Sequence, residues 1–165
     1  HQESYYNFMH RNLFDHLDIK EENINIPNSE VENLQEECDR YNKLLNENTI
    51  DIQLLGIGGN GHIGFNEPGT SFLSQTSIIK LADKTREDNK RFFNSIDEVP
   101  KYAITMGIKN ILDSKAIVLI ASGKGKAEAI NKLINGKITE SFPASVLRNH
   151  PHVTVIIDED SATLL

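Results

Sequence analysis

Cysteine is nearly absent from this sequence, with Cys38 alone among 165 residues. A single cysteine excludes a disulfide within the chain, and no CxxC or Cys/His spacing typical of a zinc site is present. No apolar run approaches the roughly 20 residues of a membrane-spanning helix. The sequence contains no basic segment followed by an apolar one, the pattern that indicates a signal peptide. These absences favour a cytoplasmic protein that has no membrane partner.

Positive charge is also scarce, because 17 Lys and Arg face 24 Asp and Glu, for a net charge of −7. This balance argues against non-specific nucleic-acid binding, which needs a basic surface. The net negative charge does not exclude a small anionic ligand, because such a ligand needs only one local basic pocket. Hydrophobic residues make up 38% and charged residues 25%, which is typical of a globular domain with a real core. We therefore expect a single domain over residues 1–165.

Hydrophobic periodicity predicts helices and strands in alternation along the chain. Helices are expected over 4–17, 30–47, 84–93, 107–115 and 125–137, and strands over 50–58, 76–81, 102–107, 115–123 and 152–160. Ser29 is expected to cap the second helix and Gly136 to end the last one. The first residues, from His1, read as a helix already inside a fold, so we expect further chain upstream.

The apolar strands are continuous runs, as in KAIVLIASG at 115–123. Such runs are typical of a parallel sheet that helices cover on both faces. Their alternation with helices predicts an α/β fold, a three-layer sandwich with a mostly parallel, Rossmann-like sheet. Ligands bind such sheets at the carboxyl ends of the strands, so the loops after residues 58, 107 and 123 are candidates for the site.

The first of these loops lies in the glycine-rich stretch LLGIGGNGHIGFNEPGT, residues 54–70. GIGGNG at 56–61 matches GxGxxG after a strand, and Asp83 lies about where a ribose-binding acid would be expected. That fingerprint requires a helix to follow at once, and Gly64 and Pro68 oppose one. A P-loop also fails, because no GKS or GKT is present. The stretch therefore does not predict a dinucleotide or nucleotide site.

The same loop carries Asn60, His62 and Glu67. Histidine is the side chain best suited to proton transfer near neutral pH, and a nearby carboxylate can orient it. A metal site is disfavoured because no second His or Cys lies close by. The residues alone predict an acid–base unit, and they leave open that His62 is an ordinary loop histidine and the glycines are turn residues.

The segment LLGIGGNGHIGFNEPGTSF resembles the signature of the glucosamine-6-phosphate deaminases, also called isomerases. HQESYYNFMHRNLFDH, RFFNSIDEVPKYAITMGI and SGKGKAEAI resemble the same family, so the likeness covers essentially the whole chain. It implies conversion of glucosamine 6-phosphate and water to fructose 6-phosphate and ammonia without a cofactor or metal.

The resemblance also implies roughly seventy to eighty further residues upstream. These would carry a phosphate loop and the aspartate that is the base for enolisation. The sequence would then be the C-terminal two thirds of a deaminase domain, and inactive alone.

By this resemblance, His62 is the acid–base residue that opens the sugar ring, and Glu67 is its carboxylate partner. Asn60 stands where some members have aspartate, and an asparagine can orient His62 or a substrate hydroxyl through hydrogen bonds. Gly58 and Gly61 are expected to let the backbone approach the sugar closely.

Arg91 and Lys126 match the family's phosphate ligands, although Lys124 is near enough to serve in place of Lys126. A guanidinium fork suits a phosphate, and the first turn of a helix favours an anion. Some members are hexamers activated by N-acetylglucosamine 6-phosphate. The matching positions here are Ser77 and Ile79, which carry no charge, so we expect no such activation. A homo-oligomer is left open.

Two other functions are left open. 6-Phosphogluconolactonase resembles this family in fold and has its own glycine-rich loop with a histidine, but the run Phe65–Pro68 with its glutamate favours the deaminase. A non-catalytic sugar-phosphate sensor on the same fold would be expected to lose the acid–base residues, yet His62 and Glu67 are both present.

Overall fold

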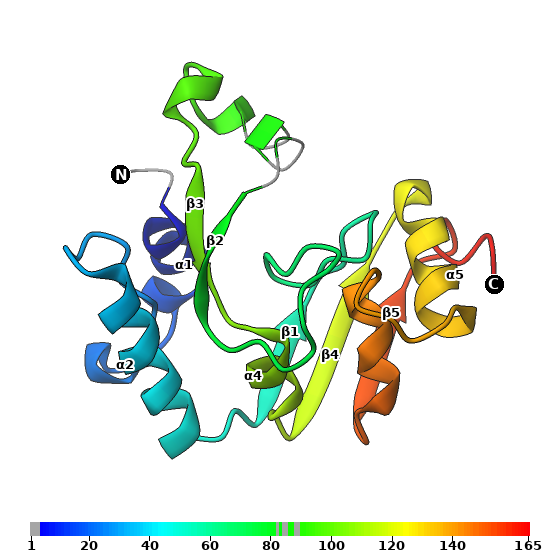
Figure 1. Ribbon diagram of the computed structural model, residues 1–165, viewed down its shortest axis with the longest axis horizontal. Coiled ribbons are helices and arrows are strands. Elements are labelled where there is room, and N and C mark those ends of the chain that lie inside the picture. Colours follow the sequence, from blue (N-terminus) through cyan, green and yellow to red (C-terminus); the bar gives the residue numbers. More distant parts are fainter. Residues whose placement is uncertain (1–3, 82, 84–85, 88–89) are drawn as a thin grey trace.

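The computed structural model describes residues 4–81, 83, 86–87 and 90–165 (Figure 1). Its helices are α1 (Tyr5–Asn12), α2 (Leu34–Glu47), α4 (Ile108–Leu112) and α5 (Ala127–Asn135). Its strands are β1 (Ile52–Leu55), β2 (Ser77–Lys80), β3 (Tyr102–Thr105), β4 (Ala116–Ala121) and β5 (Val153–Ile157). Short 3₁₀ turns include η3 (Lys90–Phe92), η4 (Ile96–Glu98), η5 (Lys124–Lys126) and η6 (Pro143–Asn149). Much of the helix expected over 84–93 lies outside the described residues.

Three of the strands form a parallel sheet in the order β1-β4-β5. Leu55 of β1 pairs with Leu119 of β4, and Ala121 of β4 pairs with Ile157 of β5, so the carboxyl ends of all three meet at one edge. The strands β2 and β3 form a separate antiparallel pair. Helices α1 and α2 lie beside the β2 and β3 pair, and α5 and η6 lie beside β4 and β5 (Figure 1). The predicted α/β fold with a Rossmann-like parallel sheet is confirmed.

One face of the parallel sheet forms the core against α5 and η6. Ile117 and Leu119 of β4 are fully buried there, together with Ile130 and Leu133 of α5 and Leu147 of η6. The apolar residues of α5 recur at helical spacing, which places them on the face toward the sheet. Each such burial contributes about 1.5–3 kcal/mol. This packing holds the carboxyl edge of the sheet in place.

The opposite face of the sheet is apolar and exposed. Ile52 and Leu54 of β1 are 66% and 62% exposed, and Ile120 of β4 and Ile156 of β5 are about half exposed. Parallel sheets are typically covered on both faces. The described residues therefore leave an apolar sheet face without cover.

The predicted start of the second helix is wrong. Helix α2 does not start after Ser29, because the Asn33 side chain caps it by accepting hydrogen bonds from the backbone N–H groups of Gln35 and Glu36. The chain between the two positions turns because the buried Glu37 carboxylate accepts the backbone N–H of Asn28 at 2.7 Å. None of the helices in the described ranges is long and apolar enough to cross a membrane.

The prediction that Gly136 ends α5 is confirmed, but the reason for a glycine there differs from the expected one. Gly136 is the residue after the helix, yet its φ of −74° is not left-handed. A Cβ there would lie 2.4 Å from the carbonyl oxygen of Lys132, so the close approach of backbone explains the glycine.

Candidate active site

The glycine-rich loop leaves β1 at Leu55 and contains no helix before β2 begins at Ser77. Its first turn is closed by two backbone hydrogen bonds, Gly58 N–H to the His62 carbonyl and Gly61 N–H to the Gly58 carbonyl, both at 2.9 Å. The prediction that no helix follows the glycines is confirmed, and a dinucleotide-binding fingerprint would require one.

Asn60, His62 and Glu67 form one hydrogen-bonded chain in this loop. The Asn60 Oδ1 accepts from the backbone N–H of His62 at 3.2 Å and lies 2.8 Å from His62 Nδ1. The Asn60 amide nitrogen donates to Glu67 Oε2 at 2.7 Å, and Glu67 Oε1 is 3.7 Å from His62 Nδ1. An amide oxygen only accepts, so Nδ1 carries a hydrogen, and in the neutral imidazole Nε2 keeps its lone pair.

His62 and Glu67 are partly buried, with side chains 30% and 24% exposed, and Asn60 is exposed. A substrate can therefore reach them from solvent. The arrangement provides a histidine of fixed tautomer, with a carboxylate near enough to stabilise the imidazolium that forms when Nε2 takes a proton. The structure thus brings together all three residues that the sequence predicted as an acid–base group.

The lack of a side chain at Gly58 leaves space for the imidazole ring of His62. A Cβ at Gly58 would lie 2.3 Å from Nδ1 and Cε1 of His62, and 2.6 Å from Nε2. The space over Gly61 is taken in the same way by the ring of Phe142, and the φ of Gly61 is +86°. Both glycines therefore serve contacts within the chain, and their predicted contact with substrate stays a prediction.

Asn66 anchors the loop from behind. This residue is 2% exposed, and its amide nitrogen donates to the carbonyls of Ile63 at 2.9 Å and Met106 at 2.8 Å. The adjacent Phe65 N–H donates to Thr105 Oγ1 at 3.2 Å. The loop after residue 107 was expected to line the site at the end of a parallel strand, but the strand before it, β3, is antiparallel. Thr105 and Met106 support the loop of His62 through these hydrogen bonds.

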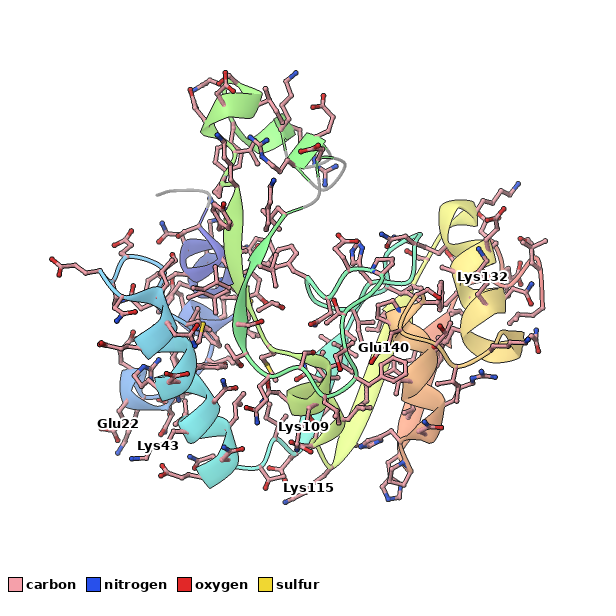
Figure 2. The ribbon with its side chains drawn as sticks, viewed as in Figure 1. Glu22, Lys43, Lys109, Lys115, Lys132 and Glu140 are labelled. Carbon is pink, nitrogen blue, oxygen red and sulfur yellow. The ribbon has the colours of Figure 1, made fainter. Side chains whose placement is uncertain are left out.

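A second anchor comes from η6 and the segment before it. The Ala144 N–H donates to the Gly61 carbonyl at 2.8 Å. The Glu140 carbonyl accepts Gly69 N–H at 2.8 Å, and its carboxylate accepts Phe72 N–H at 2.9 Å. Figure 2 shows Glu140 between the loop and η6. The loop that carries His62 and Glu67 is thus held at both ends.

Lys126 joins the loop to the next strand end. It is the last residue of η5, which follows β4, and its ammonium donates to the Ile57 carbonyl at 2.8 Å. That bond uses one of three N–H donors. Lys126 is partly buried, whereas Lys124 is exposed. Of these two lysines, Lys126 is the one whose ammonium contacts the loop of His62, which favours it over Lys124 as the cation of the candidate site.

The third strand end contributes Asp158. Both of its carboxylate oxygens accept the Gly123 N–H, at 3.0 and 2.9 Å, and Oδ1 also accepts the hydroxyl and backbone N–H of Ser161, at 2.6 and 2.8 Å. The Ser161 hydroxyl, followed by the backbone N–H groups of Ser161 and Gly123, lowers the pKa of Asp158 from its ordinary value. The residue is a carboxylate at neutral pH.

Arg91 lies elsewhere. It is an exposed residue of η3, and the segment with η3 and η4 stands at the far end of β2 and β3, apart from β4 and α5 (Figure 1). The structure does not bring Arg91 together with His62 and Lys126, and its predicted phosphate contact stays a prediction. Within the described ranges, no three His, Cys, Asp or Glu side chains gather in a way that could hold a metal ion.

Sequence reasoning missed Asn66, Phe142 and Asp158. An aspartate directly after a strand with serine three residues on is a local capping pattern, and it could have singled out Asp158 and Ser161. Phe142 had no local signal, because its partner Gly61 lies far away in sequence.

The family whose description reads glucosamine-6-phosphate isomerases/6-phosphogluconolactonase matches residues 1–156. The glucosamine-6-phosphate deaminase of Halalkalibacterium halodurans is 57% identical over 159 residues, which are 96% of this chain and 65% of that protein. Glucosamine-6-phosphate deaminase 1 of Bacillus subtilis is 54% identical over 98% of this chain and 67% of its own length. The chain therefore spans about two thirds of the length of the curated relatives it matches.

Solved structures agree with the sequence matches. A monomeric glucosamine-6-phosphate deaminase has a TM-score of 0.96 and 53% identity, covering 100% of this chain and 69% of its own. The 6-phosphogluconolactonase of Thermotoga maritima has a TM-score of 0.71 at 16% identity, covering 95% and 66%, which shows a shared fold alone. On these matches, the chain belongs to the glucosamine-6-phosphate isomerase and 6-phosphogluconolactonase family.

Proposed function

We propose that the protein converts glucosamine 6-phosphate and water to fructose 6-phosphate and ammonia, in the degradation of amino sugars in the cytoplasm. The observation that carries the proposal is the chain from Glu67 through Asn60 to His62, which leaves Nε2 as the proton acceptor. Relatives named glucosamine-6-phosphate deaminase at 57% and 54% identity support the choice of substrate.

In the first step, His62 Nε2 takes the proton of the O1 hydroxyl and returns a proton to the ring oxygen as the ring opens. Glu67 stabilises the imidazolium between these transfers, and Asn60 keeps the ring in the orientation that presents Nε2. This loop supplies proton transfer at O1 and at the ring oxygen, and no other step is assigned to it.

The second step is removal of the C2 proton to give an enolamine. Protonation at C1 then gives an iminium at C2, to which water adds as ammonia leaves and the C2 ketone forms. The base for that step is not among the residues matched here to the family pattern. We propose that this sequence is one α/β domain corresponding to the C-terminal two thirds of the deaminase domain, and that expressed alone it releases no ammonia. The exposed apolar face of β1, β4 and β5 supports a longer domain.

Lys126 is proposed to bind the 6-phosphate, and Arg91 is proposed to add a second cation. Lys126 supports the first assignment because its ammonium sits where the loops after β1 and β4 meet, with two N–H donors remaining. For Arg91 the support is the family resemblance alone.

The test is ammonia release from glucosamine 6-phosphate by the full-length protein, its His62→Gln variant and a His152→Gln control. His152 is an exposed residue at the opposite end of the sheet. We expect His62→Gln to lower kcat about 10²–10⁴-fold, the usual contribution of general acid–base catalysis, and the control to match the parent.

Other outcomes separate the alternatives. A parent that releases no ammonia but hydrolyses 6-phosphogluconolactone would favour the lactonase. A parent that binds glucosamine 6-phosphate without turnover would favour the sensor. Undiminished ammonia release from His62→Gln would remove His62 from the mechanism.

A further inference from the structure

The Asp158 carboxylate holds the turn after β4. Gly123 begins that turn with φ +84°, a left-handed conformation that favours glycine. Its N–H points at the Asp158 carboxylate, and its carbonyl accepts the Lys126 N–H at 3.0 Å. The path of the chain from Gly123 to Lys126 is therefore fixed by a hydrogen bond at each end.

Asp158 is itself held by Ser161. Ser161 is fully buried, and its hydroxyl and backbone N–H both donate to Oδ1 of Asp158. The contact at 2.6 Å is in the range of a strong hydrogen bond to an ionised acceptor. The carboxylate thus has its orientation fixed before any ligand arrives.

The charge of Asp158 is of the wrong sign for direct binding of a phosphate. A carboxylate near the turn repels an anion, and it also occupies the Gly123 N–H that an anion could have accepted. Asp158 therefore favours phosphate binding only if the shape that it imposes on the turn strengthens binding more than its negative charge weakens it.

We propose that Asp158 is a positioning residue that shapes the turn from Gly123 to Lys126 for the 6-phosphate of the substrate. The inference rests on the proposed function, in which Lys126 binds that phosphate. Asp158 does not touch the substrate. It acts through the Gly123 backbone, and Ser161 secures it.

The electrostatic and the positioning roles of Asp158 predict opposite changes in the KM for glucosamine 6-phosphate, so the Asp158→Asn variant distinguishes them. Asparagine removes the negative charge and keeps Oδ1 as an acceptor for Ser161, but it replaces Oδ2 by an NH2 group that donates and cannot accept the Gly123 N–H at 2.9 Å. If only charge mattered, the KM for glucosamine 6-phosphate would fall. If the carboxylate positions the turn, KM rises about ten-fold, the effect of losing one hydrogen bond to a charged group, while kcat stays within about two-fold.

The measurement is steady-state ammonia release by the full-length protein at saturating and limiting glucosamine 6-phosphate. Ser161→Ala keeps the charge and removes the 2.6 Å contact, and we expect it to raise KM in the same direction by about three-fold. Asp51→Asn is the matched control, because Asp51 is an exposed carboxylate paired with Lys115 at the opposite end of the sheet. It should leave KM and kcat unchanged.

Each result has a single meaning. An active parent with KM unchanged or lowered in Asp158→Asn overturns the positioning role. If Asp158→Asn lowered both kcat and the thermal stability of the protein, Asp158 would instead be a residue that stabilises the fold. A parent without ammonia release contradicts the proposed function and is distinguished from both, because the parent is assayed first.

Discussion

Gly58→Ala tests whether the position of the His62 ring, rather than its presence, supports the reaction. The added methyl group would lie 2.3 Å from Nδ1 and Cε1 of His62. Because the ring is 30% exposed, it can swing toward solvent without disturbing the core. The swing breaks the 2.8 Å contact between Nδ1 and Asn60, which contributes about 0.5–1.5 kcal/mol to the free energy of unfolding.

The effect on rate should exceed the effect on stability. A displacement of about 1 Å can lower catalysis about 10²-fold, and complete loss of acid–base assistance costs about 10²–10⁴-fold. We therefore expect Gly58→Ala to lower kcat at least about a hundred-fold. The free energy of unfolding should fall by no more than about 1.5 kcal/mol. The assay is ammonia release from glucosamine 6-phosphate, with urea denaturation of the same preparations.

Gly59→Ala is the matched control, because a Cβ at Gly59 meets nothing within 4 Å. Neither Gly58 nor Gly59 has a positive φ, so the entropic effect of replacing glycine in the unfolded chain is the same for both and cancels in the comparison. Equal kcat in the two variants would refute the reasoning. A loss of several kcal/mol in Gly58→Ala alone would show that the ring cannot move and that the fold bears the clash.

Two other predictions concern stability and regulation. Hydrogen bonds from the Arg40 guanidinium above all, and then from the Asn28 backbone, hold the pKa of Glu37 below its usual range despite its burial. The stabilisation that Glu37 provides is therefore complete above its unfolded pKa of about 4.3 and is lost as pH falls through the lower folded value. Glu37→Gln should lower the free energy of unfolding by about 1–2 kcal/mol at pH 7, and the difference should vanish in strong acid. N-acetylglucosamine 6-phosphate should not change kcat or KM of the full-length protein, because Ser77 and Ile79 on β2 carry no charge; activation by that compound would contradict this prediction.

The strands could be predicted because burial leaves a direct trace in the sequence. The run at 115–123 is apolar throughout, and β4 occupies its centre with neighbours on both edges. The antiparallel pairing of β2 with β3 could not be predicted, because a short apolar strand has the same sequence pattern in parallel and antiparallel sheets. Helix starts were less predictable. Ser29 and Asn33 are both good caps, and a long-range contact of Glu37 decided between them.

The candidate site divides in the same way. His62, Asn60 and Glu67 lie within eight residues, so a local loop could bring them together, as the structure does. The residues that hold the loop are distant in sequence. The ring of Phe142 over Gly61 and the Asp158 carboxylate on Gly123 arise from the order of strands β1-β4-β5, which brings those segments together. No local pattern reports that proximity.

The neutral side chain at Asn60 gives the loop a distribution of charge that an aspartate would not. The Asn60 amide joins Glu67 and His62 by donating to one and accepting from the other. An aspartate in the same position would set a second carboxylate against Glu67 at about the 2.7 Å of the present contact, and like charges that close cannot both remain ionised without cost. With asparagine, Glu67 alone carries the negative charge near the imidazole. In the proposed mechanism, proton transfer at His62 therefore depends on one carboxylate and on the geometry that Asn60 imposes. This makes that geometry, and the glycine that permits it, the feature of the candidate site most sensitive to substitution.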